Sequence, residues 1–356
     1  MSLPKTMKAM VLTAHGGMDC LAWREDMPVP QPRPDEVLVQ VGAAAVNNTD
    51  INTRIGWYSK SVEGDTASGT DGFGAAADAD GGWSGALQFP RIQGADCCGR
   101  IVAVGAEVSE ARVGERVLIR AMHRPGPNDP DLPLITFGSE RDGGFAEYTT
   151  ISSHDALRIT SLLSDVELAS FPCAFSTAEG MIQRAGLGAE RVLITGASGG
   201  VGSAAIQLAK RRGAHVTAVT SASKAEALRD LGADETLNRD AALAENSFDV
   251  VLDLVGGNSW PRLLDALRPG GRYAVSGAIA GPIVDLDLRT LYLNDLTIFG
   301  CTQQADSVFS DLVRYIEQGE VKPTVAMTYP LAELKAAQEA FLKKAHVGKI
   351  GITVSG

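Results

Sequence analysis

RVLITGASGGVGSAAIQLAKRR, residues 191–212, carries the local signals from which the architecture of this chain can be inferred. The apolar run 192–194 predicts a strand that is buried on both faces. The turn that follows has almost no side-chain bulk. From Val201 onward the apolar residues recur at helical spacing, and the basic run 210–212 suits the negative end of a helix dipole. Strand, glycine turn and helix in this order predict a dinucleotide site, because backbone N–H groups at the helix start hold a pyrophosphate.

The residues expected to hold the phosphates are those of the turn itself: Ala197, Ser198, Gly199, Gly200, Val201 and Gly202. Their pattern has alanine at the position where the usual fingerprint has its first glycine. A glycine-rich turn alone is equally compatible with a simple tight turn. The preceding strand and the repeated β–α units that follow favour nucleotide binding.

Strand and helix patterns alternate regularly after this unit. Strands are predicted at 215–220, 248–253, 272–276 and 296–300, and helices at 224–231 and 260–267. This succession is typical of a parallel sheet with helices on both faces. The predicted fold class is therefore α/β, with a doubly wound Rossmann sheet in this part of the chain.

The N-terminal half has a different pattern, with short strands separated by turns. Residues 37–41, 96–105, 116–119 and 143–151 read as strands, and a short helix is expected to follow Asn47. Residues 59–88 are rich in Gly, Ala, Ser and Asp and are too poor in large apolar residues to form a core of their own. This insertion is either a lid over a site or a tolerated surface loop.

Bulk properties limit the classes of function. The length of 356 residues suggests two domains, and the net charge of −11 argues against nucleic acid or an anionic membrane as partner. No apolar run approaches the roughly 20 residues of a membrane span, and the N-terminus lacks a signal-peptide core, so a cytoplasmic location is expected. The five scattered cysteines form no CxxC motif, which gives no support for a disulfide framework or a cysteine-rich zinc lobe.

The end of the second predicted strand indicates which cofactor is bound. NAD-binding units carry an acidic residue there for the ribose 2′-hydroxyl, whereas residues 219–224 contain no carboxylate. Ser221 offers a hydrogen bond and Lys224 a positive charge, which favour the 2′-phosphate of NADP(H). If Lys224 is only a solvated helix-start residue, NAD would require a ribose contact from elsewhere in the chain.

Motifs along most of the chain resemble the medium-chain dehydrogenase/reductase superfamily of zinc alcohol dehydrogenases and zinc-free quinone oxidoreductases. The matching segments are 7–10, 34–39, 94–99, 114–117, 144–148, the glycine turn, 232–234, 253–257 and 348–350. The resemblance is greatest to the zinc-independent, zeta-crystallin-like branch. It implies a GroES-like distorted β-barrel from residues 1–156 and 304–356, with the insertion 59–88, around a Rossmann domain at 157–303. It also implies a homodimer that associates near residues 288–297.

Departures from the zinc-containing pattern predict that no metal is bound. Zinc members carry Cys where this chain has Asn47, and His where it has Ala95; Cys173 stands about where their third ligand falls. A catalytic zinc needs three protein ligands, and one candidate is too few. A rearranged site that combines Asp96 and Cys173 with a neighbouring cysteine, Cys97 or Cys98, is the alternative.

The expected activity follows from the missing Lewis acid. Hydride transfer to an isolated ketone loses charge stabilisation without a metal, whereas a conjugated acceptor spreads the charge to a distant oxygen. We therefore expect an NADPH-dependent, zinc-independent oxidoreductase acting on a small quinone or α,β-unsaturated carbonyl. The alternatives are a zinc alcohol dehydrogenase with a rearranged site, and an NADPH-binding scaffold or redox sensor with little turnover.

The resemblance also assigns residues to the substrate pocket. Asn47 and Tyr58 match polar pocket positions of the zinc-free branch, and Thr49 matches a proton-relay hydroxyl, although it also suits helix capping. Thr177 is expected against the nicotinamide. Gly277 and Cys301 follow the ends of predicted strands, where ligands bind in such folds.

Overall fold

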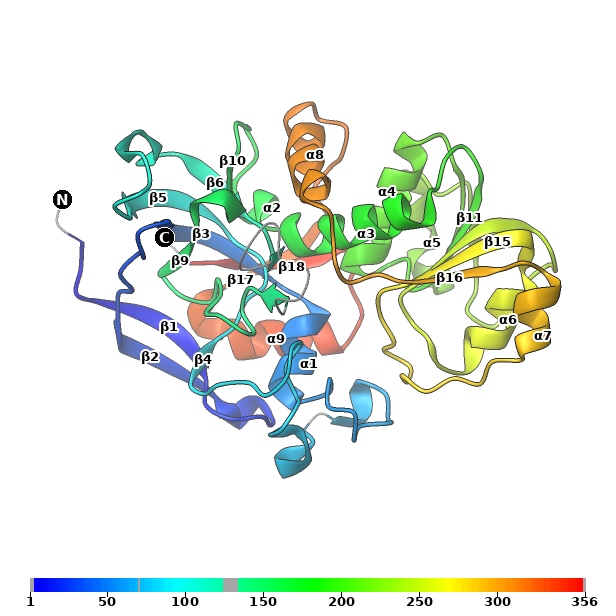
Figure 1. Ribbon diagram of the computed structural model, residues 1–356, viewed down its shortest axis with the longest axis horizontal. Coiled ribbons are helices and arrows are strands. Elements are labelled where there is room, and N and C mark those ends of the chain that lie inside the picture. The colour runs from blue at the N-terminus through cyan, green and yellow to red at the C-terminus, as the bar shows by residue number, and fades with distance from the viewer. Residues whose placement is uncertain (1–2, 70, 124–133, 355–356) are drawn as a thin grey trace.

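The computed structural model describes residues 3–69, 71–123 and 134–354, in which two layered halves lie side by side (Figure 1). The half on the right of Figure 1 holds a sheet in which all neighbouring strands are parallel. In spatial order its strands are β13 (Glu235–Leu237), β12 (His215–Val219), β11 (Arg191–Ile194), β14 (Phe248–Asp253), β15 (Leu267–Val275) and β16 (Thr297–Gly300). This order is that of a Rossmann sheet, which confirms the predicted α/β fold.

Alternation along the central strands explains why helices cover both faces of this sheet. Val192 and Ile194 of β11 share one hydrophobic cluster, whereas Leu193 between them belongs to another. Successive side chains of a strand point to opposite faces of the sheet. An uninterrupted apolar run therefore places apolar side chains on both faces, and helices must pack against each of them. The helices that pack against the sheet are α3 (Pro172–Ala185), α4 (Gly200–Arg211), α5 (Ala225–Asp230), α6 (Trp260–Asp265) and α7 (Leu288–Leu293).

The other half is a barrel-like sheet that contains segments from both ends of the chain. Its strands are β10 (Ala156–Arg158), β6 (Arg116–Ile119), β5 (Cys98–Val104), β3 (Glu36–Val46), β18 (Lys349–Thr353), β17 (Val325–Pro330) and β9 (Tyr148–Ser152), which pairs with β3. Ile350 of β18 lies opposite Val46 of β3 in an antiparallel pair. The red C-terminal strand therefore lies beside the blue N-terminal one in Figure 1.

Smaller elements complete this half. The strands β2 (Leu21–Pro28), β1 (Thr6–Leu12) and β4 (Arg91–Ile92) form a separate sheet, and β7 (Met122–His123) pairs with β8 (Ile135–Thr136). The helices are α1 (Asn48–Ile55), α2 (Asp165–Leu168), α8 (Asp306–Glu317) and α9 (Leu334–Leu342). Helix α1 begins with a capping box between Asn47 and Asp50 and ends at Gly56, whose φ of 76° favours glycine.

Several predicted boundaries were wrong. Strand β15 begins at Leu267, within the helix predicted over 260–267 and five residues before the predicted strand, and α6 ends at Asp265. The sequence pattern predicts a helix over residues 177–185, but α3 begins five residues earlier, at Pro172, because proline is well placed in the first helical turn. The strand predicted at 143–151 is regular only from Tyr148. Of the longer strands, β2 and β17 were not predicted. The sequence between Met122 and Asp142 is rich in proline and charge and is predicted to be a loop; its residues 124–133 lie outside the described residues.

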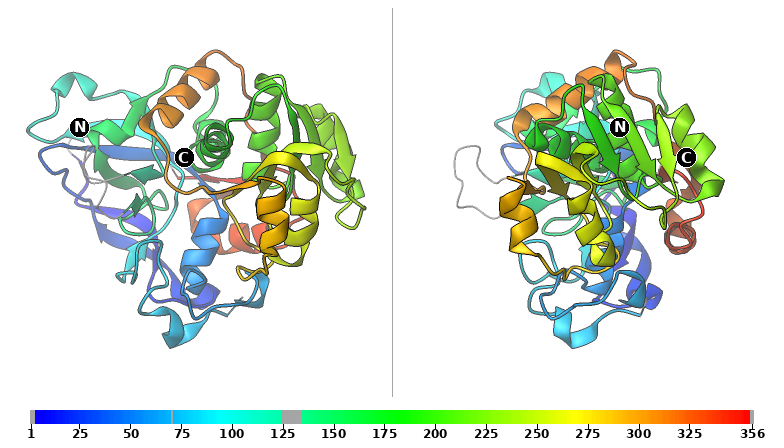
Figure 2. Two further views of the ribbon diagram at one scale, coloured as in Figure 1. Left: turned by 45° about the vertical axis from the view of Figure 1, so that its right-hand side comes forward. Right: turned by 90° about the vertical axis from the view of Figure 1, so that its right-hand side faces the viewer.

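The insertion 59–88 forms the lowest part of the molecule in Figures 1 and 2. Although it forms no core of its own, Leu87 and Phe73 pack against the cluster of the barrel half. Its backbone also reaches the parallel-sheet half, because the Thr66 N–H donates to the carbonyl of Ile279 over 3.1 Å. The insertion therefore contacts both halves.

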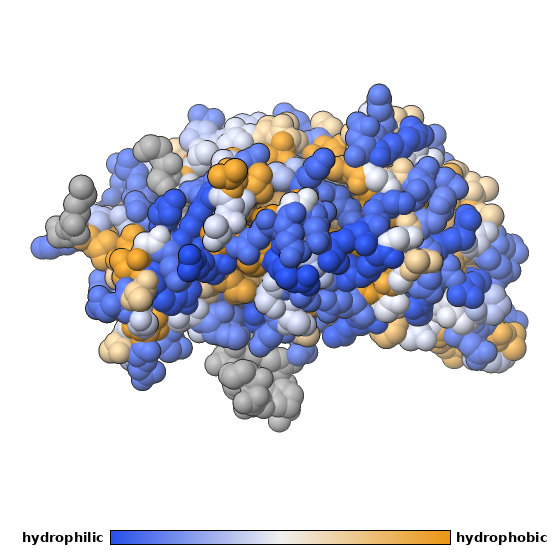
Figure 3. All heavy atoms as spheres, turned by 90° about the horizontal axis from the view of Figure 1, so that it is seen from above, coloured by the Kyte–Doolittle hydropathy of each residue, from blue (hydrophilic) through white to orange (hydrophobic). Residues whose placement is uncertain are grey.

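Seen from above, the surface is mainly hydrophilic, with apolar residues in scattered patches (Figure 3). Among the described residues, no helix combines the length and the apolar character that a bilayer crossing requires.

Candidate functional site

A cavity of about 690 Å³ lies between the parallel sheet and the barrel half. Its walls come from the glycine turn, the segments after β12, β14 and β15, the start of α1, the insertion and residues 341–349. Ligands of doubly wound sheets bind at the carboxyl ends of the strands, and this cavity occupies that place.

The glycine turn meets the requirements of a phosphate site. Helix α4 begins at Gly200 after the N-cap Gly199. Because no helical turn precedes them, the first backbone N–H groups of α4 have no carbonyl acceptor within the helix. A Cβ on Gly202 would lie 2.5 Å from the Cα of Ala197, whereas one on Gly199 would meet only the carbonyl of Gly196 at 3.4 Å. Gly202 therefore allows close packing of helix on strand, and Gly199 leaves the wall of the cavity open. The turn fits a bound pyrophosphate.

Two cations follow the carboxyl ends of β12 and β13. Lys224 and Arg239 both line the cavity, and burial followed by repulsion from Arg239 lowers the pKa of Lys224. Asp240 lies beside them, and Ser221 lines a small pocket that shares Arg239 and Asp240 with the main cavity. Arg239 could not be predicted from the motifs, because it follows the short strand β13 and not the glycine turn or β12.

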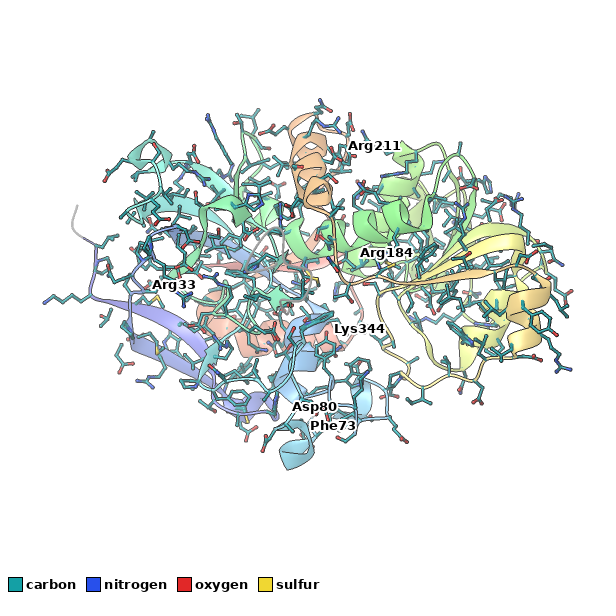
Figure 4. All side chains as sticks on the ribbon, viewed as in Figure 1. Arg33, Phe73, Asp80, Arg184, Arg211 and Lys344 are labelled. Atoms are coloured by element: carbon teal, nitrogen blue, oxygen red, sulfur yellow. The ribbon has the colours of Figure 1, made fainter. Side chains whose placement is uncertain are left out.

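The C-terminal segment closes over the phosphate end of the cavity. Gly348 donates its N–H to the carbonyl of Ser198 over 2.9 Å, and the Lys224 ammonium donates to the carbonyl of Lys344 over 2.6 Å. Figure 4 places Lys344 between the two halves, whereas Phe73 and Asp80 lie on the insertion below it. Burial, and then Lys224, lower the pKa of Lys344 to about 8. These residues make a positively charged end for the cavity.

A buried ion pair lies at the cavity wall, where Lys349 is one of the lining residues. The Lys349 ammonium donates to Asp96 Oδ2 over 2.7 Å, to the Val46 carbonyl over 3.1 Å and to Asn47 Oδ1. Asn47 donates its amide Nδ2 to Asp96 over 2.8 Å. Lys349 is 2% exposed and Asp96 is fully buried, so each charge is neutralised by the other inside the protein.

Cys173 adjoins this pair but remains a thiol. Its backbone N–H donates to Asp96 Oδ1 over 2.7 Å. Burial, and then the charge of Asp96, raise the pKa of the Cys173 thiol, although Lys349 opposes this rise. Within the described ranges, no group of three or more His, Cys, Asp or Glu side chains is arranged to hold a metal ion.

Hydroxyl and aromatic groups gather where α1 meets the insertion. Trp83 of the insertion donates its indole N–H to Thr49 Oγ1 over 2.6 Å, and its ring centroid lies 4.7 Å from that of Tyr58. Burial raises the pKa of Tyr58, and hydrogen bonds with Thr49 and Asn52 oppose that rise. The Tyr58 hydroxyl therefore stays protonated at neutral pH and can donate.

The structure brings most of the predicted residues to the cavity wall. The predicted residues on the wall are Asn47, Thr49, Tyr58, Thr177, Ser198, Gly199, Gly200, Val201, Gly202, Lys224 and Gly277. Thr177 donates its hydroxyl to the carbonyl of Cys173 over 2.7 Å. Ala197 and Cys301 are buried and do not belong to that wall; Cys301 instead pairs its backbone N–H with the carbonyl of Val275.

Comparisons with known proteins extend over the whole chain. A family model described as an alcohol dehydrogenase GroES-like domain matches residues 33–161, and one described as a zinc-binding dehydrogenase matches residues 200–318. The structure of a putative alcohol dehydrogenase from Sinorhizobium meliloti has a TM-score of 0.87 and 43% identity, over 99% of this chain and 98% of that one.

Two curated relatives are plant reductases. An NADPH-dependent alkenal/one oxidoreductase, chloroplastic, of Arabidopsis thaliana is 28% identical over 358 residues, which cover 98% of this chain and 80% of the relative. A 2-methylene-furan-3-one reductase of Solanum lycopersicum is 29% identical over 331 residues, which cover 91% of this chain and 72% of the relative.

Proposed function

Because this chain belongs to the medium-chain dehydrogenase/reductase superfamily, we propose that it is an NADPH-dependent oxidoreductase that reduces a quinone or an α,β-unsaturated carbonyl without a catalytic zinc. The names of the Arabidopsis and Solanum relatives support a conjugated acceptor. The observation that carries the proposal is the Lys349 ammonium, which is held between Asn47 and Asp96 beside Cys173.

The positive charge of the Lys349 ammonium supports a site without zinc. The oxygens of Asn47 and Asp96 already bind one buried cation, so a divalent ion beside Lys349 would meet strong repulsion in a site of low dielectric. Ala95 offers no ligand, so Cys173 would be the one thiol at a site that needs three protein ligands.

The cofactor proposal rests on the glycine turn and the cations around it. Gly199 and the first N–H groups of α4 would hold the pyrophosphate, and Lys224 with Arg239 would hold the 2′-phosphate. When bound there, NADPH supplies a hydride. Thr177 and Gly277 line the same cavity.

The residues of α1 and the insertion would stabilise the acceptor. As a hydride adds to the β-carbon of an enone, the electron pair of the C=C bond moves toward the carbonyl oxygen. Thr49 and Tyr58 present hydroxyl donors at the cavity wall, where they can hydrogen-bond that oxygen as its charge develops. A proton at the α-carbon then completes the saturated ketone, and the protonated Tyr58 hydroxyl is the donor we propose for it.

Isotope transfer tests the proposed reaction. Protein incubated with an enone and NADPH that carries deuterium at the transferable C4 position should place the deuterium on the β-carbon of a saturated ketone. Deuterium at the carbonyl carbon of an allylic alcohol would contradict the proposed site of attack.

We expect the double substitution Lys224→Ala and Arg239→Ala to raise KM for NADPH roughly 10- to 100-fold, because charge-assisted hydrogen bonds to the 2′-phosphate are lost. KM for NADH, which lacks that phosphate, should change little. Lys322→Ala, at an exposed lysine away from the cavity, is the control and should leave both constants unchanged. Equal effects of the double substitution on both cofactors would contradict the assignment.

Cofactor affinity should depend on pH through Lys344. In the free protein its pKa is lowered to about 8, and a bound phosphate group would raise it again. Free Lys344 is charged below pH 8 and neutral above it, so NADPH binding should weaken as pH rises from 7 to 9. Titration calorimetry should show proton uptake on binding near pH 8.5, and Lys344→Met should remove most of that uptake. Unchanged uptake in the variant would argue against this role.

We further propose that two copies associate through the edge of the parallel sheet. Strand β16 lies at the edge in the observed strand order, and α7 beside it exposes Tyr292 by 62% and Leu293 by 69%. Large apolar side chains next to an open edge favour pairing with another chain. Leu293→Asp is expected to halve the mass measured by light scattering, whereas Leu162→Asp, at an exposed site on a distant loop, should not. A monomeric wild-type protein would refute the proposal.

A further inference from the structure

Trp83 is the large aromatic residue that the insertion contributes to the cavity wall. It lies in a tight turn in which the Gly82 N–H donates to the Gly85 carbonyl over 2.8 Å. The next residue, Ser84, donates its N–H to Glu140 over 3.1 Å and its hydroxyl to the carbonyl of Leu134. Because the residue after Trp83 is bonded to Glu140 and Leu134, the barrel half helps to hold the turn that carries the indole.

The indole makes two contacts with the groups proposed to bind the acceptor. Its N–H donates to Thr49 Oγ1 over 2.6 Å. A threonine hydroxyl accepts with its lone pairs and donates with its single hydrogen, so this bond leaves that hydrogen to the Thr49–Tyr58 hydrogen bond or, in exchange for it, to a bound acceptor. The indole ring also lies 4.7 Å from Tyr58, with an angle of 40° between the planes, and Tyr58 in turn contacts Trp57 edge to face.

These contacts build an aromatic wall beside the hydroxyl donors. Trp57, Tyr58 and Trp83 all line the cavity. Flat aromatic groups gain from stacked or edge-on contacts with such a wall beyond the gain from burying apolar area.

We propose that Trp83 determines specificity, by selecting acceptors whose conjugated system carries an aromatic ring and by holding Thr49 as a hydrogen-bond donor toward their carbonyl oxygen. This inference rests on the proposed function, because it names the class of acceptor for the same site. The Trp83 side chain thus has two roles: its ring selects aromatic acceptors, and its N–H orients the Thr49 hydroxyl.

Two substitutions separate these roles. Trp83→Leu removes the aromatic wall, and Trp83→Phe keeps an aromatic ring but removes the N–H. Trp23→Leu is the matched control, since Trp23 lies in β2 and donates its indole N–H to Glu25, away from the cavity. The acceptors are 4-phenylbut-3-en-2-one and its aliphatic counterpart pent-3-en-2-one.

The wild-type protein should prefer the phenyl enone in kcat/KM, and Trp83→Leu should lower that preference about 2- to 10-fold, the range expected for lost aromatic contacts. Trp83→Phe should keep most of the preference but lower kcat with both acceptors. Trp23→Leu should change neither quantity. A preference that is absent from the wild type or unchanged in Trp83→Leu would overturn the proposal.

Binding of unreactive ketones gives the same comparison without turnover. Calorimetry with protein saturated with NADP⁺ compares 4-phenylbutan-2-one with pentan-2-one, and Trp83→Leu should reduce the affinity ratio by the same factor. If the wild type reduced no acceptor, the proposed function would fail, yet the affinity ratio would still decide the role of Trp83. An equal ratio in the wild type and in Trp83→Leu would refute that role.

Discussion

Replacing Lys349 by methionine is expected to lower the free energy of unfolding by about 3 to 5 kcal/mol, because the substitution leaves the carboxylate of Asp96 buried without a counter-charge. The same change would leave Asn47 Oδ1 without its donor. Urea unfolding of the variant and the wild type measures the difference.

A double-mutant cycle identifies the ion pair as the cause. Combining Lys349→Met with Asp96→Asn removes both charges, so the double variant should recover much of the stability that the single variant loses. The matched control is Lys210→Met, which breaks the partly exposed pair of Lys210 with Asp234 at 2.9 Å and should cost less than about 1 kcal/mol. Equal losses for Lys349→Met and Lys210→Met would contradict the buried pair.

Thr49→Val should reduce kcat/KM for an enone roughly 100- to 1000-fold, the loss typical when a donor to a developing oxyanion is removed. The substitution keeps the shape of the side chain but removes the hydroxyl. It also leaves the Trp83 N–H without its acceptor. Steady-state kinetics at saturating NADPH would measure the effect.

Two further variants test whether the hydroxyl itself is responsible. Thr49→Ser keeps the hydroxyl and should retain most of the activity. Thr149→Val makes the same substitution at a buried threonine in β9, outside the cavity wall, and should leave kcat/KM nearly unchanged. Activity of Thr49→Val within twofold of the wild type would exclude Thr49 as the donor.

The parallel sheet could be predicted from sequence because each of its signals is local. The apolar run 192–194, the glycine turn and the helix after it lie within 22 residues, and the structure contains all three. The barrel half was harder to predict, because β18 completes its sheet by pairing with β3 from the other end of the chain. Pairing over such a distance leaves no pattern within either segment.

The candidate site likewise contains residues that local motifs identify and residues whose role depends on contacts distant in sequence. The glycine turn, Thr49 and Tyr58 could be proposed from motifs. Lys349 was noted in a motif, but its role could not be foreseen because it meets Asp96 across 253 residues of sequence. Trp83 lies in an insertion whose composition predicts only a loop, and its contact with Thr49 depends on how the barrel half anchors that loop.

The central claim is hydride transfer to a conjugated acceptor without zinc, and the most direct test measures metal content and activity on the same sample. Protein dialysed against a strong chelator should contain much less than one zinc per chain by mass spectrometry and should still oxidise NADPH with an enone at its original rate. Stoichiometric zinc in the untreated protein, with activity lost on its removal and restored on its return, would contradict the account.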